Sequence, residues 1–396
     1  MPGLLRDVVR MCWLAGTAMI AAVPAAAQDP KAPVIPPVAS LTDGMWMKGD
    51  LHLHSRHSTD SSNNPVSAII GFAERNGFDF LAITDHDNHV QGDVASHTWR
   101  DPEFRSDRVV LLYGAEWTTD RGHGNIFSAR PYDHQKLYDL RDARDAKILA
   151  AKQTLGVHLS ANHPAAGKDH FGFSYDMVDS IEIWNSAVWP RNAATLLIWD
   201  DMLRSGRKIA GRGGSDSHHG VPPSPDKATR NSAEATANYV GTPTTWVFAK
   251  ARTPAAVVEA LTNGRACVSA NPRGPRVEFY GDRDGDGQMD MMMGDNVRAS
   301  GKPVHFVVKL TGGVVANASY RVLVIRDGQP FGEFEAKGEA PVASFEDSPA
   351  ADTRSYYRVQ VEGPQTPYPE VPNSMPLSGK MVGLSNPIFF NFDPEF

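Results

Sequence analysis

Histidines and carboxylates are concentrated in one stretch of the sequence, where they could together hold metal ions. Thirteen of the fourteen histidines lie between positions 52 and 219, and only His305 lies outside that stretch. His52 and His54 close the first expected strand, and side chains two residues apart in an extended chain project to the same face. Both imidazoles can therefore reach one ion. Neutral imidazole and carboxylate are typical ligands of zinc, iron and manganese.

The same residue types recur at the ends of four further expected strands. They stand at Asp85-His86, at Glu116, at His163 and at Asp216-Ser217-His218, and Asp60 follows the first strand in the next loop. In barrels of parallel strands the carboxyl ends face one mouth, where the active site lies. Each motif alone has a simpler interpretation as a surface pair or a turn, but their conjunction favours a metal centre. The candidate ligands outnumber the needs of one tetrahedral ion, so we expect two or three ions bridged by Glu116 or Asp216.

The elements that must position these residues alternate between strand and helix from residue 45 to about 270. Short apolar runs that end in polar residues or Gly predict strands at 46–52, 78–84, 109–114, 156–161, 180–184 and 208–211. Helices are expected at 65–76, 134–155, 191–205 and 254–263. This order predicts an α/β fold with a mostly parallel sheet or barrel.

After residue 275 the pattern changes to an alternation of apolar and polar residues between Gly, Pro and Asp turns. This alternation predicts strands at 304–310, 320–326, 332–336 and 356–362. We therefore expect a small all-β, sandwich-like C-terminal domain at 275–396, after a metallohydrolase domain at 45–270.

Length and composition set further limits. The chain has 396 residues, with 39 Lys+Arg, 46 Asp+Glu and a formal net charge of −7. Its 41% hydrophobic content is that of an ordinary globular protein, and its length is enough for two domains. The diffuse acidic balance argues against a dedicated nucleic-acid binder, which usually carries a basic surface.

The N-terminal residues 1–27 read as a secretory signal peptide. Arg6 and Arg10 precede an apolar run at 11–23, which is shorter than the roughly 20 residues that a membrane span needs. An A-x-A cleavage site lies before Gln28, and a Pro-rich linker follows at 28–44. We therefore expect a periplasmic or secreted protein that makes no membrane contact once the signal is removed.

Removal of the signal would leave a single cysteine. The chain has two, Cys12 and Cys267, and the first lies within the signal. One cysteine makes neither an intramolecular disulfide nor a Cys-rich zinc site, so core burial or metal must stabilise the fold.

The motifs and their order resemble those of the PHP (polymerase and histidinol phosphatase) superfamily over residues 45 to about 250. The motifs in question are Asp50-Leu51-His52-Leu53-His54, Thr84-Asp85-His86, the strand end at Glu116, Asn162-His163-Pro164 and Ser215-Asp216-Ser217-His218. The resemblance implies a distorted seven-stranded (β/α) barrel with up to three ions. The export signal and the C-terminal β domain are similar to the carbaryl-hydrolase branch of these metallohydrolases.

The resemblance also implies a ligand set, position by position. The metal ligands would be His52, His54, Asp60, His86, Glu116, His163, Asp216 and His218. His123 matches a position that is a ligand in some members and a substrate contact in others. Asp60 stands where the family has His or Asp, which leaves the metal open between zinc, manganese and iron.

These features predict a hydrolase that uses a metal-activated hydroxide against an ester. The candidate catalytic residues are His123, Asp85 and Arg212. Asp85 would orient a ligand, unless it is a simple turn residue. Arg56 and Lys168 could bind a phosphoester as cations in mouth loops, although any one arginine is more often a solvated surface charge.

The residues leave open which bond is broken. The superfamily favours small phosphoesters by analogy, with Asn185 as a further substrate contact. The aromatic residues Trp117, Trp184, Trp189 and Trp199 could instead line a pocket for an aryl ester or carbamate. Core packing is the alternative for the set and is favoured for Trp199. A non-catalytic binding protein is the third alternative. We expect a small-molecule ester as partner and no nucleic acid, and the oligomeric state is left open.

A second type of ion is expected near the junction of the two domains. Asp282, Asp284, Asp286 and Asp290 have the spacing of a calcium loop, with Gly287 at its sixth position. The twelfth position is Met293 instead of Glu, so the motif is incomplete. It predicts either a structural calcium site or an acidic turn.

Overall fold

The part of the chain that carries the histidines forms strands joined by helices. The computed structural model describes residues 43–63, 65–89, 96–167, 170–186, 189–219, 239–368 and 380–392, without the side chains of residues 96, 97 and 189–191. The predicted signal peptide at 1–27, most of the linker at 28–44, Lys168 and the side chain of Trp189 lie outside this description. Across the described ranges, no helix is both long enough and apolar enough to cross a bilayer.

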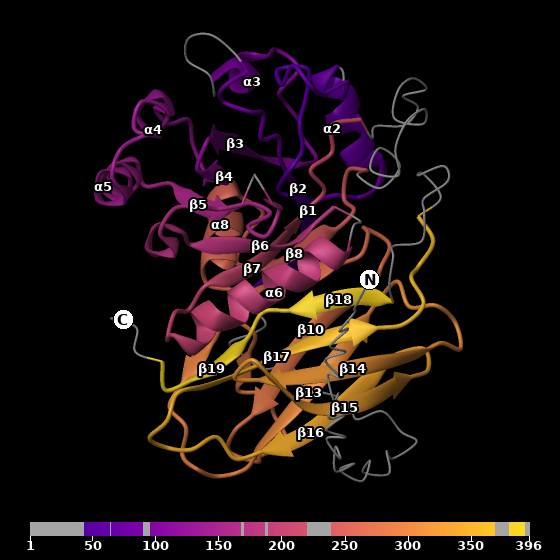
Figure 1. Cartoon of the computed structure of the whole chain (residues 1–396). Coiled ribbons are helices and arrows are strands. Elements are labelled where there is room, and N and C mark those ends of the chain that lie inside the picture. Colours follow the sequence, from indigo (N-terminus) through magenta and orange to yellow (C-terminus); the bar gives the residue numbers. More distant parts are fainter. Residues whose placement is uncertain are drawn as a thin grey trace, which may run out of the picture. The chain divides into compact units, whose positions relative to one another are not determined.

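Strands and helices alternate through this part of the chain, which is mixed α/β as expected (Figure 1). Its strands are β1 (Met45–Asp50), β2 (Phe80–Ala82), β3 (Val110–Thr119), β4 (Gly122–Ser128), β5 (His158–Ala161), β6 (Ser180–Asn185), β7 (Ala210–Gly214), β8 (Thr244–Ala249) and β9 (Ala266–Ser269). Its helices are α2 (Val66–Arg75), α3 (Ser96–Arg100), α4 (Gln135–Tyr138), α5 (Asp145–Leu155), α6 (Trp189–Arg204) and α8 (Pro254–Thr262), with a 3-10 turn η2 (Tyr175–Met177).

Local sequence sets the ends of these helices. Pro254 opens α8, and the side chain of Thr253 accepts a hydrogen bond from the backbone N–H of Ala256 at 3.3 Å. Helix α5 ends at Gly156, whose φ of 64° lies in the left-handed region that glycine adopts without strain. Both ends follow ordinary capping rules, which is why the sequence predicts them closely.

One expected helix is broken in the structure. Residues 134–155 form α4 and α5, separated by turns over 139–144. Arg121 donates hydrogen bonds to the carbonyl of Ala143 at 3.1 Å and to the carboxylate of Asp145 at 2.6 Å. This side chain from the turn between β3 and β4 holds the break and the start of α5, so the prediction of one continuous helix is wrong.

The strands of the first part form one ladder in the order β8-β1-β2-β3-β4-β5-β6-β7. The pairs β1–β2, β2–β3, β5–β6 and β6–β7 are parallel, whereas β8–β1, β3–β4 and β4–β5 are antiparallel. The β3–β4 hairpin is an addition to the expected strand–helix alternation. The residues after β1 and β7 are joined by a parallel bridge between Leu53 and Ser217. The seven-stranded barrel itself stays a prediction.

The last part of the chain is rich in strands. They are β10 (Arg276–Asp282), β11 (Met291–Met292), β12 (Asn296–Val297), β13 (Val304–Thr311), β14 (Ser319–Arg326), β15 (Gln329–Lys337), β16 (Val342–Asp347), β17 (Ser355–Glu362), β18 (Met381–Ser385) and β19 (Ile388–Phe390). The sheet β11-β10-β13-β16 contributes Phe279 and Phe306 to a core that it shares with Val324 and Tyr357 of the strands β14 and β17. The ring centroids of Phe306 and Tyr357 are 4.7 Å apart. Such a shared core is what a sandwich-like arrangement requires.

Main-chain pairing continues across the expected domain boundary near residues 270–275. Strand β9 pairs with β8 on one side and with β18 on the other, both antiparallel. The side chain of Asn386 accepts from the N–H of Gly211 at 2.7 Å and donates to its carbonyl at 2.8 Å. The limits of the two domains stay a prediction, and hydrogen bonds link the strands on either side of them.

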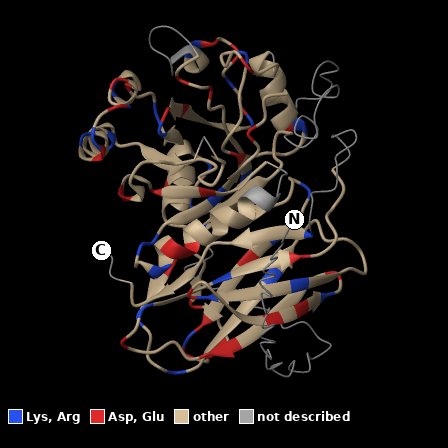
Figure 2. Ribbon diagram, viewed as in Figure 1, with Lys and Arg blue, Asp and Glu red and all other residues tan. Residues whose placement is uncertain are grey.

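Charged residues of both signs alternate over the strands of the last part (Figure 2). Arg321 on β14 contacts Glu333 on β15 and lies 2.8 Å from Glu362 on β17. Lys337 lies 2.7 Å from Glu335 on the same strand. These exposed pairs contribute little free energy individually, and they keep the solvent side of the sheet polar.

Candidate metal centre

The loops after β1 and β7 are tied together by the buried side chain of Asp50. Its Oδ1 accepts hydrogen bonds from the N–H groups of His52 and Ser215, both at 3.1 Å, and its Oδ2 accepts from that of Gly241 at 2.7 Å. The N–H of Asp216 donates to the carbonyl of His52 at 2.7 Å. These bonds place the H-x-H and D-x-H motifs side by side, although they are far apart in the sequence.

Hydrogen bonds fix the protonation form of the two histidines after β1. Nδ1 of His52 donates to a carboxylate oxygen of Glu182 at 2.9 Å. Nδ1 of His54 donates to Oγ of Ser58 at 3.2 Å, and this hydroxyl donates in turn to Asp85 at 2.9 Å. Because Nδ1 carries a proton in both rings, Nε2 is the nitrogen left to face a cation. Both rings are fully buried.

Two histidines from other loops also carry the proton on Nδ1. The hydroxyl of Thr118 donates its proton to the carbonyl of Glu116 at 3.1 Å, so its oxygen can only accept from the ring of His86. Nδ1 of His86 therefore donates to this oxygen at 2.7 Å. Nδ1 of His218 donates to the carbonyl of Asp216 at 2.9 Å. In all four imidazoles an acceptor holds Nδ1 and Nε2 faces a carboxylate, as in metal-binding histidines. That carboxylate is Glu116 or Asp216 for His52 and His54, and Asp60 for His86 and His218.

The carboxylate of Glu116 lies among five imidazole rings. Glu116 lies in the second half of β3, and its side chain is fully buried. Its oxygens lie within 3.0 to 3.4 Å of ring nitrogens of His52, His54, His86, His123 and His163. A buried carboxylate in contact with so many nitrogens is suited to bridge two cations.

Two aspartates complete the arrangement on either side of Glu116. Oδ1 of Asp216 lies 3.4 Å from Nε2 of His52 and 3.3 Å from Nε2 of His54. Oδ2 of Asp60 lies 3.5 Å from Nε2 of His86 and 3.6 Å from Nε2 of His218. All the residues expected to be metal ligands therefore lie around one centre.

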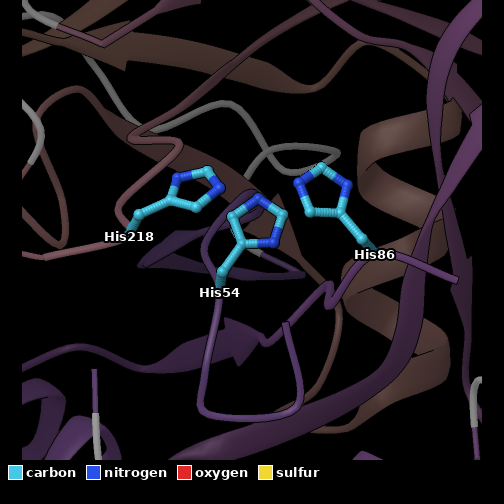
Figure 3. Close-up of side chains that lie close together, drawn as sticks. All are labelled: His54, His86 and His218. Atoms are coloured by element: carbon cyan, nitrogen blue, oxygen red, sulfur yellow. The ribbon is translucent and has the colours of Figure 1, made fainter. Parts of the chain in front are cut away.

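Three of the rings come from three different loops and face one another (Figure 3). The centroids of His54 and His218 are 4.0 Å apart and those of His54 and His86 are 4.4 Å apart, with both pairs stacked. One ring nitrogen of each residue falls within a single group of potential ligand atoms that are at most 4.8 Å apart. Three charged imidazolium rings would repel one another at this distance, whereas neutral rings around a cation would not.

The distances between ligand atoms fit divalent ions better than they fit hydrogen bonds. A charge-assisted N–H···O bond is about 2.7–2.9 Å long. Two ligands at about 2.1 Å from a tetrahedral ion lie about 3.4 Å apart, which is close to the 3.3 to 3.4 Å between Nε2 of His52 and His54 and the oxygens of Glu116 and Asp216. Among the described residues, nothing hydrogen-bonds Nε2 of His52, Nε2 of His54 or Oε2 of Glu116, although all three atoms are buried. The donor set therefore fits divalent cations.

The electrostatics of the centre favour added positive charge. Burial opposes the charged form of His52, yet Glu182, Asp216 and Glu116 outweigh it and hold the pKa of His52 well above its usual range. Burial likewise opposes the charge of Glu116, but the neighbouring histidines keep the pKa of Glu116 well below its usual range. Burial, followed by His218 and other nearby rings, holds the pKa of His54 well below its usual range. Ionised carboxylates and a neutral imidazole are the forms that bind metal.

The catalytic role predicted for Arg212 is not supported and needs correction. Its side chain is fully buried and donates to Glu182 at 2.8 Å and to Ser160 at 2.7 Å, and it also contacts Asn162. A guanidinium committed to three protein groups away from solvent does not reach a substrate. Its role is to hold Glu182, which in turn holds His52.

Asp85 and its neighbours form a network beneath the ligands. The oxygens of Asp85 accept from the N–H and hydroxyl of Ser55, both at 2.7 Å, and from the hydroxyls of Ser58 at 2.9 Å and Thr98 at 2.7 Å. All four of these hydrogen bonds to the carboxylate of Asp85 come from groups of the protein itself. The carboxylate is linked to His54 through Ser58, and the orienting role expected for Asp85 stays a prediction.

The predicted substrate contacts have different surroundings. The amide of Asn185 donates to Glu182 at 3.1 Å and to Asp216 at 3.3 Å, so it lies within the centre. Arg56 forms an ion pair with Asp101 at 2.6 Å. Lys168 lies outside the described residues. Substrate binding by these residues stays a prediction.

The tryptophans that could have lined an aryl pocket belong to the core. Trp117, Trp184 and Trp199 are each at most 1% exposed and share one apolar cluster. Nε1 of Trp117 donates to the carbonyl of Leu137 at 3.1 Å. Their burial corresponds to the core-packing alternative for these three residues.

Sequence reasoning missed Glu182 and His89. Glu182 is fully buried on β6 between the isoleucines of an apolar strand, and a carboxylate in such a run was the one signal that could have pointed to it. Nδ1 of His89 lies 3.5 Å from Oδ1 of Asp60. No spacing rule links His89 to the other motifs.

Comparison with known proteins supports the PHP resemblance for part of the chain. Residues 50–163 match the model of the PHP domain. No curated protein matches the chain. A solved two-domain protein from Bacteroides vulgatus, described as containing a predicted PHP-like metal-dependent phosphoesterase, is 16% identical with a TM-score of 0.47, and the match covers 91% of this chain and 100% of that one.

A second solved structure matches a smaller part. It is the CARDB domain of a Pyrococcus furiosus protein in complex with di-metal ions, 13% identical with a TM-score of 0.18. That match covers 29% of this chain and 94% of the other. The PHP domain match at 50–163 includes His52, His54, His86, Glu116 and His163 of the centre.

Proposed function

We propose that the chain is a metal-dependent hydrolase whose centre holds two or three divalent ions. One observation carries the proposal: Nδ1 of four histidines is hydrogen-bonded, and their Nε2 atoms face carboxylates at spacings that suit a cation. Nε2 of His52 and His54 faces the buried Glu116 and the partly buried Asp216, and Nε2 of His86 and His218 faces the exposed Asp60. The PHP domain match at 50–163 supports the same conclusion.

The ligand atoms divide into groups that share residues. His52 and His54 group with Asp216, His52 and His163 group with Glu116, and His86 and His123 also group with Glu116. Asp60, His86 and His89 form a further group. Since Glu116 and His86 recur, the ions would lie close enough together for Glu116 to bridge them.

The chain's own residues prepare this centre in a definite way. Bound ions would supply a Lewis acid for the substrate oxygen and a water of lowered pKa. The carboxylate of Glu182 accepts a hydrogen bond from Nδ1 of His52, which keeps the proton on that nitrogen. Ser58, which itself donates to Asp85, accepts one from Nδ1 of His54. Asn185 orients Asp216 through its amide. His123 touches Glu116 at 3.2 Å, so we propose it as a ligand in preference to a proton donor.

We favour a phosphoester as the substrate. A centre with several cations matches the charge of a phosphoryl group and can stabilise both the attacking and the leaving oxygen. An aryl carbamate, the substrate type of the carbaryl-hydrolase branch, would call for an apolar pocket, and Trp117, Trp184 and Trp199 are committed to the core. No observation in the described residues favours that alternative or a non-catalytic binding protein.

The test is activity against a substrate panel before and after metal removal. The purified protein would be stripped with a chelator and reloaded with Zn²⁺, Mn²⁺ or Fe²⁺, then assayed with nucleotides, aryl phosphates and aryl carbamates. We expect phosphoester hydrolysis that vanishes on stripping and returns with one of the ions. The double variant H54A/D216A should lose it, and H305A, which alters an exposed histidine of β13, should retain it.

Turnover of carbamates alone would overturn the phosphoester assignment. Activity that survives both stripping and H54A/D216A would overturn the metal-dependent mechanism.

We further propose that the Asp-rich turn between β10 and β11 binds calcium in a structural role. Both oxygens of Asp282 accept from the turn's own N–H groups, at Gly285 (2.7 Å) and Gly287 (3.0 Å), and Asp290 accepts from the N–H of Arg283 at 2.8 Å. The spacing of the carboxylates supports the proposal. Calcium should raise the melting temperature of the protein but not of D284N/D286N, and an equal melting temperature with and without calcium would refute it.

A further inference from the structure

His89 lies beside one group of ligand atoms, outside the positions that the family resemblance supplies. Its Nδ1 is 3.5 Å from Oδ1 of Asp60, and its ring centroid is 4.4 Å from that of His86. One nitrogen of His89, one nitrogen of His86 and one oxygen of Asp60 lie within 4.8 Å of one another. Three such atoms from three residues could bind a single ion.

The surroundings of Nδ1 of His89 suit a bound cation. Within the described part of the chain this nitrogen is buried and has no hydrogen-bond partner. Its 3.5 Å separation from the Asp60 oxygen is too long for a charge-assisted hydrogen bond of about 2.7–2.9 Å, and it is close to the edge of a ligand tetrahedron. A buried imidazole nitrogen in that position is costly unless something binds it.

Asp60 offers its two oxygens to different rings. Oδ2 lies 3.5 Å from His86 and 3.6 Å from His218, whereas Oδ1 lies 3.5 Å from His89. Asp60 supplies oxygen where some relatives would supply nitrogen. An extra imidazole at this side of Asp60 would restore a nitrogen donor to the ion.

We propose that His89 binds, through Nδ1, the ion that Asp60 and His86 hold. This inference rests on the proposed metal centre and extends its ligand set by one residue. It also predicts a preference at this position for zinc or iron over magnesium and calcium, because imidazole is a poor ligand for the harder ions.

The experiment is calorimetric titration of the stripped full-length chain with Zn²⁺. Wild type, H89A and H89D would be compared with H170A, which removes an exposed histidine whose Nδ1 lies 2.9 Å from the carbonyl of Gly167. We expect H89A to weaken one zinc-binding step by at least about tenfold and to leave the other steps unchanged. H89D, which keeps a donor atom, should recover part of that loss, and H170A should match wild type.

The possible outcomes separate this inference from the function on which it rests. Wild-type affinity at every step in H89A would overturn the role of His89 and leave the metal centre intact. A wild-type protein that binds no zinc, manganese or iron would overturn both. If H89A fails to fold, H89D decides the matter, because unchanged preference for zinc over magnesium in H89D would contradict a nitrogen donor at this position.

Discussion

At the scale of single residues, the centre depends on the proton positions of its histidines as much as on their spacing. The hydroxyl of Thr118 accepts a hydrogen bond from Nδ1 of His86, and the carboxylate of Glu182 accepts one from Nδ1 of His52. An imidazole with no acceptor for Nδ1 would exchange tautomers or rotate, and would present Nε2 to a cation only part of the time. Residues that never touch an ion therefore set its affinity.

The pair of variants T118V and T118S tests this dependence on the hydroxyl. Valine matches threonine in shape but removes the acceptor for Nδ1 of His86, whereas serine keeps it. We expect T118V to weaken zinc binding by about 10- to 100-fold and T118S to remain close to wild type. Zinc titration of the stripped proteins measures both, and equal affinities in the two variants would show that the hydroxyl does not position His86.

The sequence predicts the ligands better than the residues that orient them. His52, His54 and His86 stand at strand ends, and the period-2 rule places the first two on one face. Glu182 and Arg212 are different, because their roles depend on which side chain lies opposite them in the folded chain. The sequence therefore predicts a catalytic role for Arg212, whose side chain binds Glu182 instead.

At the scale of elements, strands that end at the same edge bring the ligands together. The expected strand at 180–184 corresponds closely to β6, whereas β3 continues to Thr119, past the expected end at 114. Strand β4 was missed because residues 122–128 begin with two glycines and a histidine, which read as a turn, and only pairing with β3 and β5 makes them a strand. Pairing across a sheet is not visible in local sequence.

Strand β5 carries a titratable group that links it to neighbouring elements. Nε2 of His158 lies 2.7 Å from the hydroxyl of Ser180 on β6, and Nδ1 lies 2.8 Å from that of Thr262 on α8. Burial lowers the pKa of His158 to about 4, and Lys152 and Arg212 act in the same direction against Asp179. The folded protein therefore resists the protonation of this ring.

This shift predicts a loss of stability in acid. The unfolded chain binds the proton near pH 6.5 and the folded chain only near pH 4, so the free energy of unfolding falls as pH decreases through that window. Between pH 8 and pH 5 we expect His158 to contribute a decrease of about 2 kcal/mol. Urea unfolding of the stripped protein should show a decrease smaller by that amount in H158Q, and an identical pH dependence would contradict the assignment.

At the scale of the whole molecule, a buried ion pair joins the helix after β6 to the last sheet. The guanidinium of Arg358 on β17 donates two hydrogen bonds to Asp200 on α6, at 2.8 and 2.5 Å, and both side chains are buried. The hydroxyl of Tyr356 donates to the same carboxylate at 2.8 Å. Together with β9–β18 pairing, these bonds tie the two parts of the chain.

Breaking that pair should be costly. In R358M the carboxylate of Asp200 stays buried without its cation, and we expect the free energy of unfolding to fall by about 3–5 kcal/mol. R321M removes an exposed ion pair and should cost at most about 1 kcal/mol. Chemical denaturation of both variants measures the difference, and equal midpoints would show that Arg358 adds nothing to the link.

The long-range links were beyond prediction from the sequence. The alternation after residue 275 identifies β13, β14 and β17, although residues 306–308 of β13 and 355–359 of β17 are buried on both faces. Nothing in the alternation shows that β9 pairs with β18 across more than a hundred residues, or that Asp200 faces Arg358. Such contacts depend on how complete elements pack.

The central claim is that side chains from several loops converge to hold cations, and anomalous diffraction tests it most directly. Crystals grown with Mn²⁺ or Zn²⁺ would be measured at the absorption edge of the ion. We predict two or three peaks enclosed by His52, His54, Glu116, Asp216 and His86. A map with no peak among these residues, or with their side chains turned into separate surroundings, would contradict the claim.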